Sequence, residues 1–189
     1  MKNVAVDAAL AAVRRGAISP AAERVPLAKA MGRVLAEAVL AGRDQPPFNA
    51  SAMDGYAVRR DSLKTKARQV TLHLVGESAA GRAYTGTVAA GEAVRIFTGA
   101  PVPADCNAVV IQENVTRQAD VIDVLPDGRK PDGPSHIRKA GQDFKAGDTL
   151  LEPGQRLDPW RLSLVAAAGL DTVPVWRRPK IAVLCTGDE

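Results

Sequence analysis

Hydrophobic and polar positions follow different periods along the chain, and the changes of period divide it into segments. Residues 4–15 place apolar side chains at the spacing of one helix face, which predicts a helix. Residues 70–75 alternate strictly between apolar and polar, which predicts a strand. The run 34–40 is too short for its period to decide, so strand and helix both stay open there.

Strand-like runs dominate the middle of the chain. Short apolar runs at 94–97, 108–111 and 121–125 are separated by turns rich in glycine and proline. We therefore expect residues from about 50 to 135 to form a compact all-β module. The residues before and after it would form a more helical or mixed unit, into which the module is inserted.

Sequence signals typical of a helix return in the last third of the chain. Asp158 is a good N-cap, Pro159 stands at the favoured first helical position, and Gly169 suits the residue after the helix. An apolar run at 180–185 then leads into a polar, glycine-containing loop that ends at Glu189. Ligands of open α/β sheets bind at such strand ends. No helix follows this strand, so we expect the sequence to stop at the start of an α/β unit.

The composition of the chain argues against several classes of protein. The chain has 189 residues, of which 46% are hydrophobic and 24% charged, which is typical of a soluble globular protein. The net charge is only +4 and the basic residues are scattered, so nucleic-acid binding is not expected. Cys106 and Cys185 lack any metal-binding spacing and are expected to be reduced thiols. Without an apolar run near 18 residues or a signal sequence, we expect a cytoplasmic protein with no membrane association.

Three polar positions are candidates for chemistry. Asp54 stands at a bend just before Gly55, where its carboxylate can bind a cation or a polar ligand, although Asp-Gly pairs also mark ordinary turns. Thr98 and Gly99 end a strand, and such a turn either presents a hydroxyl and amides to an anion or only reverses the chain. Asp143 is either a cleft carboxylate or a turn acid. The residues alone leave these alternatives open.

Several ordered blocks of sequence resemble the molybdopterin molybdenumtransferase family, which includes the C-terminal region of gephyrin. The resemblance extends over nearly the whole chain, and the block around Asp54 is its longest. The matching blocks are NASAMDGYAV at 49–58, RIFTGAPVP at 95–103, VIQE at 110–113, IRKAGQDF at 137–144 and VLCTGDE at 183–189.

The resemblance implies a mixed α+β fold in an elongated subunit. Residues 1–48 and 136–177 would form a discontinuous first domain, and residues 49–135 an inserted β-rich domain. Residues 178–189 would be the beginning of an α/β domain that binds molybdopterin, cut off at its first strand. This agrees with the interrupted unit expected from the pattern near Glu189.

The resemblance also implies a reaction and its participants. Members of the family insert molybdate into adenylated molybdopterin, release AMP and use Mg²⁺, and they form homodimers whose active-site cleft is shared between subunits. A polypeptide of these 189 residues alone is expected to be inactive, because the α/β domain would be missing.

Particular residues acquire implied roles through the matching blocks. The expected Mg²⁺ ligands are Asp54 and Asp143, whose charge would suit an anionic substrate only with a metal bound. The alternative for Asp188 and Glu189 is that they are merely polar residues at the end of the sequence. The implied catalytic residues are Asp54, Thr98, Asp143 and Glu189, and the implied cofactor-binding residues are Ser51, Gly99 and Asp188.

Two other classes of function compete with an enzyme. A scaffold would dimerise and bind a partner without catalysis, and it would tolerate the loss of Asp54, Thr98 and Asp143. A simple sugar- or anion-binding β-module would bind its ligand without any further domain. The presence of all three polar residues favours the enzyme.

Overall fold

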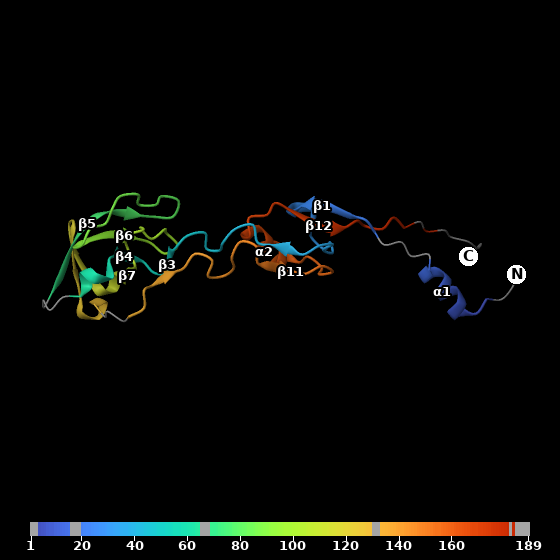
Figure 1. The fold of residues 1–189 in the computed structure, drawn as a ribbon, viewed down its shortest axis with the longest axis horizontal. Helices are drawn as coiled ribbons and strands as arrows, with labels where there is room; N and C mark the ends of the chain where they lie inside the picture. Colours follow the sequence, from blue (N-terminus) through green and yellow to red (C-terminus); the bar gives the residue numbers. More distant parts are fainter. Residues whose placement is uncertain (1–3, 16–19, 65–68, 130–132, 182, 184–189) are drawn as a thin grey trace. The chain divides into compact units, whose positions relative to one another are not determined.

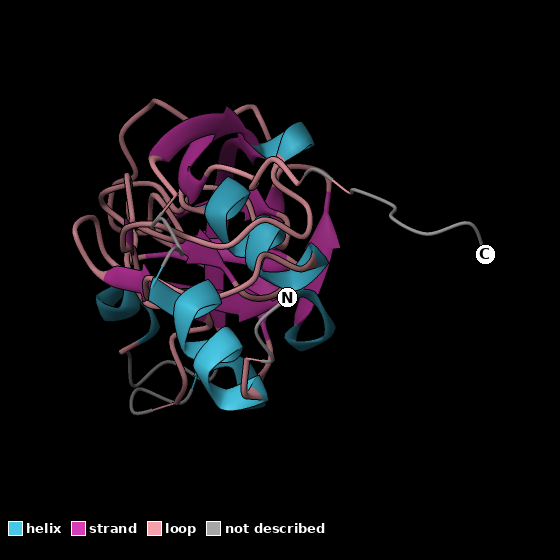
Figure 2. Cartoon of the chain, turned by 90° about the vertical axis from the view of Figure 1, so that its right-hand side faces the viewer, coloured by secondary structure: helices cyan, strands magenta, loops and turns pink. Residues whose placement is uncertain are grey.

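The computed structural model describes residues 4–15, 20–64, 69–129, 133–181 and 183. It divides into two compact units, which we call the split unit (Met1–Leu40 with Thr149–Glu189) and the sheet unit (Ala41–Asp148). Strands and loops predominate and helices are few (Figure 2), which confirms a mixed fold. The sheet unit is longer at both ends than the expected β-domain 49–135. The expected division of residues 1–189 into three domains stays a prediction.

The described residues of the split unit form two α-helices, one short 3-10 helix (Leu27–Lys29) and two pairs of strands. In each pair the strands run antiparallel, with β1 beside β12 and β2 beside β11 (Figure 1). The helix expected at 4–15 is present, and the ambiguous run 34–40 contributes only the short strand β2. The elements are α1 (Val6–Arg15), β1 (Ala22–Pro26), β2 (Val39–Leu40), β11 (Thr149–Leu151), α2 (Pro159–Ala167) and β12 (Thr172–Trp176).

One aliphatic cluster forms the core of the split unit. Val25 of β1 faces Val173 of β12 in register, and both side chains are buried. Helix α2 contributes Val165, whereas α1 buries no residue. The cluster consists of Val25, Ala30, Leu35, Val39, Leu151, Leu157, Val165, Val173 and Val175.

Helix α2 begins and ends as its sequence predicts. The backbone N–H of Arg161 donates to Asp158 Oδ1 over 2.8 Å, which satisfies one of the free N–H groups of the first turn. Pro159 is the first helical residue. Gly169 has a φ of 81°, a conformation that glycine adopts without steric cost at a helix end.

The cap gives a first testable prediction. We expect Asp158→Ala to lower the free energy of unfolding by about 1 kcal/mol, because the first turn of α2 loses a hydrogen-bond acceptor. Urea denaturation measures the change, and Asp171→Ala is the control because Asp171 is an exposed residue outside any helix. Equal effects of the two substitutions would contradict a capping role.

The sheet unit contains a six-stranded sheet in the order β7-β4-β6-β5-β9-β8. All neighbours run antiparallel except β5 and β6, which are parallel, and a separate short pair joins β3 to β10. The expected strands at 70–75, 94–97, 108–111 and 121–125 are confirmed. The elements are β3 (Ala50–Ser51), β4 (Gly55–Val58), β5 (Val70–Ser78), β6 (Glu92–Ile96), β7 (Ala108–Ile111), β8 (Val115–Gln118), β9 (Val121–Val124) and β10 (Ile137–Arg138).

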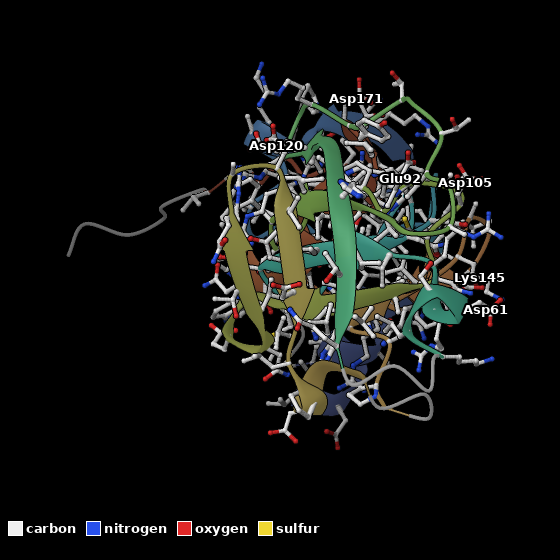
Figure 3. The ribbon with its side chains drawn as sticks, turned by 90° about the vertical axis from the view of Figure 1, so that its left-hand side faces the viewer. Asp61, Glu92, Asp105, Asp120, Lys145 and Asp171 are labelled. Carbon is white, nitrogen blue, oxygen red and sulfur yellow. The ribbon has the colours of Figure 1, made fainter. Side chains whose placement is uncertain are left out.

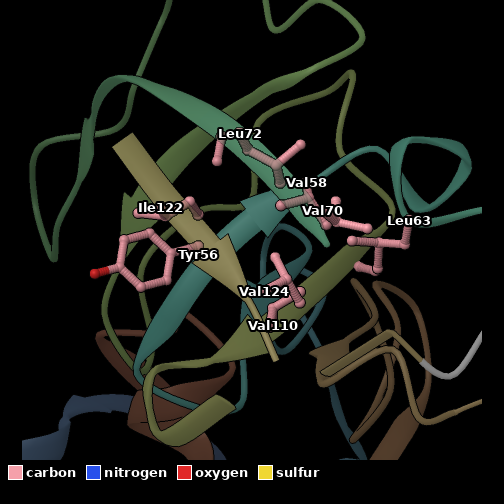
Figure 4. Packing of buried hydrophobic residues seen from close by; sticks show 10 residues of the cluster. Tyr56, Val58, Leu63, Val70, Leu72, Val110, Ile122 and Val124 are labelled. Atoms are coloured by element: carbon pink, nitrogen blue, oxygen red, sulfur yellow. The ribbon is translucent and has the colours of Figure 1, made fainter. Parts of the chain in front are cut away.

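The interior strand β4, second from one edge of the sheet, is buried on both faces. Tyr56 and Val58 point into one cluster together with Leu72 and Ile122 (Figure 4). Ala57, between them in sequence, points into a second cluster on the other face, because successive strand residues face opposite sides. All four residues of β4 are buried. The bend before Gly55 is therefore anchored to the best-packed strand of the sheet.

Two expectations from the sequence concern membranes and the end of the chain. No helix among the described ranges is long and apolar enough to cross a bilayer. Of the strand expected at 180–185, residues 182, 184 and 185 lie outside the described residues, and Lys180, Ile181 and Val183 have no regular secondary structure.

Candidate functional site

The candidate site is the bend between β3 and β4, which carries Asp54. Ser51 ends β3 with its side chain only 1% exposed. Its hydroxyl donates to the carbonyl of Met53 over 2.6 Å, and it accepts a weaker bond of 3.4 Å from the Met53 N–H. These bonds fold the bend locally, so that Asp54 leaves it as an exposed side chain. The Ser51 hydroxyl is thus occupied with the backbone, and a cofactor-binding role for Ser51 stays a prediction.

Thr98 holds the carboxylate of Asp54 through two hydrogen bonds. Its backbone N–H and its Oγ1 each donate to Asp54 Oδ1 over 2.8 Å. The contact spans 44 positions in sequence. It arises because Gly55 pairs with Ile96 across β4 and β6, which brings the residues beyond each strand end together.

Backbone bonds join the two segments beside this contact. Gly99 N–H donates to the Ser51 carbonyl over 2.8 Å, and Ser51 N–H donates to the Ala100 carbonyl over 3.0 Å. The structure therefore brings together Ser51, Asp54, Thr98 and Gly99, four of the residues singled out by the sequence. The Gly99 amide is used within the chain, and a cofactor-binding role for Gly99 stays a prediction.

The environment of Asp54 favours its charged form. The Thr98 backbone N–H lowers the pKa of the Asp54 carboxyl most, and the Thr98 hydroxyl lowers it further. The positive charge of Arg95 also lowers this pKa, by a smaller effect. Asp54 is therefore a carboxylate at neutral pH and presents a fixed negative charge at the bend.

Asp143 stands apart from this arrangement. Arg138 Nη2 donates to both carboxylate oxygens of Asp143, over 2.6 and 2.7 Å. Both side chains are more than 40% exposed, so the ion pair is a solvated one. Arg138 pairs with Ala50 across β10 and β3, next to Ser51. Among the described residues, no hydrogen bond or ion pair joins Asp143 to Asp54.

The two expected Mg²⁺ ligands fit the metal unequally. Within the described residues, Asp54 Oδ2 accepts no hydrogen bond, whereas Oδ1 is held by Thr98, so Asp54 can supply one oriented oxygen. Mg²⁺ commonly takes one or two protein carboxylates and completes its shell with waters and substrate phosphates. Asp143 would first have to release Arg138. Groups of three or more metal-ligating side chains are absent from the part of the chain that is described.

Three other described aspartates and Cys106 do not extend the site. Asp61, Asp105 and Asp120 lie at the surface (Figure 3). Cys106 is buried, and burial raises the pKa of its thiol to about 12, so it is not a nucleophile at neutral pH. The remaining predicted positions lie outside the described residues: Cys185, Asp188 and Glu189.

Sequence reasoning assigned no role to Arg95 and Gln112, which border the bend. Arg95 lies over the rings of Tyr56 and Phe97, with its guanidinium carbon 5.1 and 4.7 Å from the ring centroids. Gln112 N–H donates to the carbonyl of Asp54 over 3.1 Å. Both residues fall inside the matching sequence blocks, but an arginine within a strand-like run gave no sign of its contacts.

Fold and site thus define a mixed α/β protein with a polar bend anchored on a six-stranded sheet. Residues 4–169 match the family model described as the MoeA N-terminal region (domain I and II). The chain belongs to this family.

Relatives and solved structures agree with the family. A molybdopterin molybdenumtransferase of Haemophilus influenzae is 40% identical over 167 residues, which cover 88% of this chain and 40% of the relative. One from Synechococcus elongatus is 35% identical and covers 99% of this chain and 46% of the relative. A crystal structure of a molybdopterin biosynthesis MoeA protein from Pyrococcus horikoshii matches with a TM-score of 0.79 and 35% identity, over 94% of this chain and 45% of that one. The chain therefore spans less than half the length of these relatives.

Proposed function

We propose that the complete protein containing this chain is a molybdopterin molybdenumtransferase of molybdenum cofactor biosynthesis. It inserts molybdate into adenylated molybdopterin, with release of AMP. The observation that carries the proposal is the Asp54–Thr98 pair, in which a threonine amide and hydroxyl fix a charged carboxylate on a rigid strand. The match over residues 4–169 and the names of the relatives support the reaction class.

The role that we propose for the bend in the reaction is electrostatic. Cleavage of a phosphoanhydride needs neutralisation of developing negative charge, which a bound Mg²⁺ supplies. Asp54 would hold the ion through Oδ2, while Thr98 keeps the carboxylate oriented and ionised. A carboxylate near an anionic substrate would otherwise repel it, so the role of Asp54 depends on the metal.

The more distant candidates have subordinate roles in this proposal. Asp143 contributes as the partner of Arg138, and it would act as a second Mg²⁺ ligand only after that ion pair opens. Asp188 and Glu189 would contact the pterin ligand or metal from the following domain. The complete protein would be a cytoplasmic homodimer with a cleft shared between subunits.

Turnover by the complete gene product tests the proposal. The purified protein would be mixed with adenylated molybdopterin, molybdate and Mg²⁺, and AMP release and molybdenum incorporation would be followed together. We expect both products in equal amounts, and neither without Mg²⁺. AMP release without molybdenum incorporation, or no reaction at all, would refute a molybdenumtransferase and favour a scaffold or a simple binding module.

A further inference from the structure

Arg95 contacts residues close in sequence to each partner of the Asp54–Thr98 hydrogen bonds. It lies on β6 directly opposite Tyr56 of β4, and it shares its strand face with Phe97 two residues on. Its guanidinium lies over both rings, 5.1 Å from the Tyr56 centroid and 4.7 Å from that of Phe97. Tyr56 follows Gly55 in the chain, and Phe97 precedes Thr98.

The same guanidinium also fixes the backbone of the bend. Nη1 donates to the carbonyl of Gly55 over 3.1 Å, and Nη2 donates to Gln112 Oε1 over 2.8 Å. Gln112 in turn donates its backbone N–H to the carbonyl of Asp54 over 3.1 Å. The carbonyls of Asp54 and Gly55 are therefore held by the Gln112 backbone and the Arg95 side chain, and the side chains of these two residues are bonded to each other.

This closed set of contacts defines the orientation of the Asp54 side chain. The conformation of the Asp54–Gly55 peptide decides where the carboxylate leaves the backbone, and the position of Phe97 decides where the Thr98 donors lie. A planar guanidinium can serve both, since it stacks on rings with its faces and donates from its edge.

We propose that Arg95 is a positioning residue, which clamps the Asp54 bend and the Thr98 strand end so that the Asp54 carboxylate stays fixed in its orientation. The inference deepens the proposed function, because it explains how the carboxylate assigned to Mg²⁺ is kept in place. Arg95 itself need not touch the substrate. Lysine cannot replace it fully, because an ammonium group keeps the charge but loses the planar fork.

The test uses the Thr98 backbone amide as a reporter in the complete, ¹⁵N-labelled protein. This amide donates to Asp54 Oδ1, so its NMR resonance at a fixed neutral pH reports whether the carboxylate is held in place. In Arg95→Met we expect the resonance to move toward that of an amide bonded to solvent. In Arg95→Lys, which keeps the charge without the planar guanidinium, the resonance should remain displaced.

Two further variants supply a second test and a control. Gln112→Ala removes the acceptor of Arg95 Nη2 at an exposed position, and it takes over as the test if Arg95→Met does not fold. We expect it to displace the Thr98 resonance in the same direction by a smaller amount. Arg117→Met is the control, because Arg117 lies on β8 and bonds only locally to the carbonyl of Ala119 among the described contacts. A Thr98 resonance that does not move in Arg95→Met, or in Gln112→Ala if the first variant is unfolded, would overturn the positioning role.

Activity separates this inference from the proposed function. If the complete enzyme turns over, Arg95→Met should lower kcat by about tenfold to a hundredfold, as expected for a misplaced catalytic group, with a smaller change in KM. A displaced Thr98 resonance in a protein that shows no transferase activity would support the positioning role and refute the proposed function. An undisplaced resonance in an active enzyme would overturn the positioning role and leave the proposed function standing.

Discussion

Replacement of Gly55 by alanine is expected to destabilise the sheet unit strongly. A Cβ at this position would lie 2.0 Å from the carbonyl oxygen of Val110 and 2.9 Å from its carbonyl carbon, which are backbone atoms of β7. Relief of the clash requires β7 to move away from β4, and four register pairs join these strands. We expect a loss of about 3 kcal/mol in the free energy of unfolding, at the upper end of overpacking effects.

The steric origin of this effect can be separated from backbone conformation. Gly81 has a φ of +75° and open space around its missing Cβ, so Gly81→Ala should cost only the left-handed conformation, about 1–2 kcal/mol. Chemical denaturation of both variants measures the difference. If Gly55→Ala is no less stable than Gly81→Ala, β7 accommodates the methyl group and the close approach is not a constraint.

Local signals were enough where a few adjacent residues determine the structure. Asp158, Pro159 and Gly169 fix the ends of α2 by capping and backbone preference, so its bounds followed from the sequence. The strand at 108–111 was equally predictable, because a short apolar run between turns suits a buried strand.

Pairing between distant segments could not be predicted in the same way. Strand β1 has a single buried residue, Val25, and ends in Pro26, so its sequence alone does not indicate a strand. Its stability comes from β12, where Val173 and Val175 are fully buried, and β12 lies far along the chain. Periodicity within a window carries no information about such a partner.

The candidate site, too, was predictable only in part from the sequence. The resemblance to a known family pointed to Asp54 and Thr98, but their mutual hydrogen bonds depend on the register of β4 against β6. Arg95 was not predicted, because in the strand pattern it occupies an ordinary polar position. Only the structure shows that two rings and two acceptors surround its guanidinium.

Removal of the Asp54 carboxylate should abolish Mg²⁺-dependent molybdate insertion in the complete enzyme while the protein stays folded. The residue is exposed, so Asp54→Ala loses the bonds to Thr98 at little cost in packing. Asp54→Asn keeps an acceptor for Thr98 and removes only the charge. Because electrostatic stabilisation by one aimed group is worth about a hundredfold to a thousandfold in kcat, we expect a loss of at least about a hundredfold in both variants.

The comparison that decides this role is between two exposed aspartates of the same unit. Asp148 accepts a hydrogen bond from the Lys145 N–H in a surface turn, and Asp148→Asn should leave turnover unchanged. AMP release would be measured over a range of Mg²⁺ concentrations, with circular dichroism as the check on folding. Wild-type turnover in Asp54→Asn would show that the charge at the bend is not used, and the Thr98 contact would then be purely structural. A loss that high Mg²⁺ partly reverses would instead identify Asp54 as a metal ligand, because weakened binding is offset by mass action.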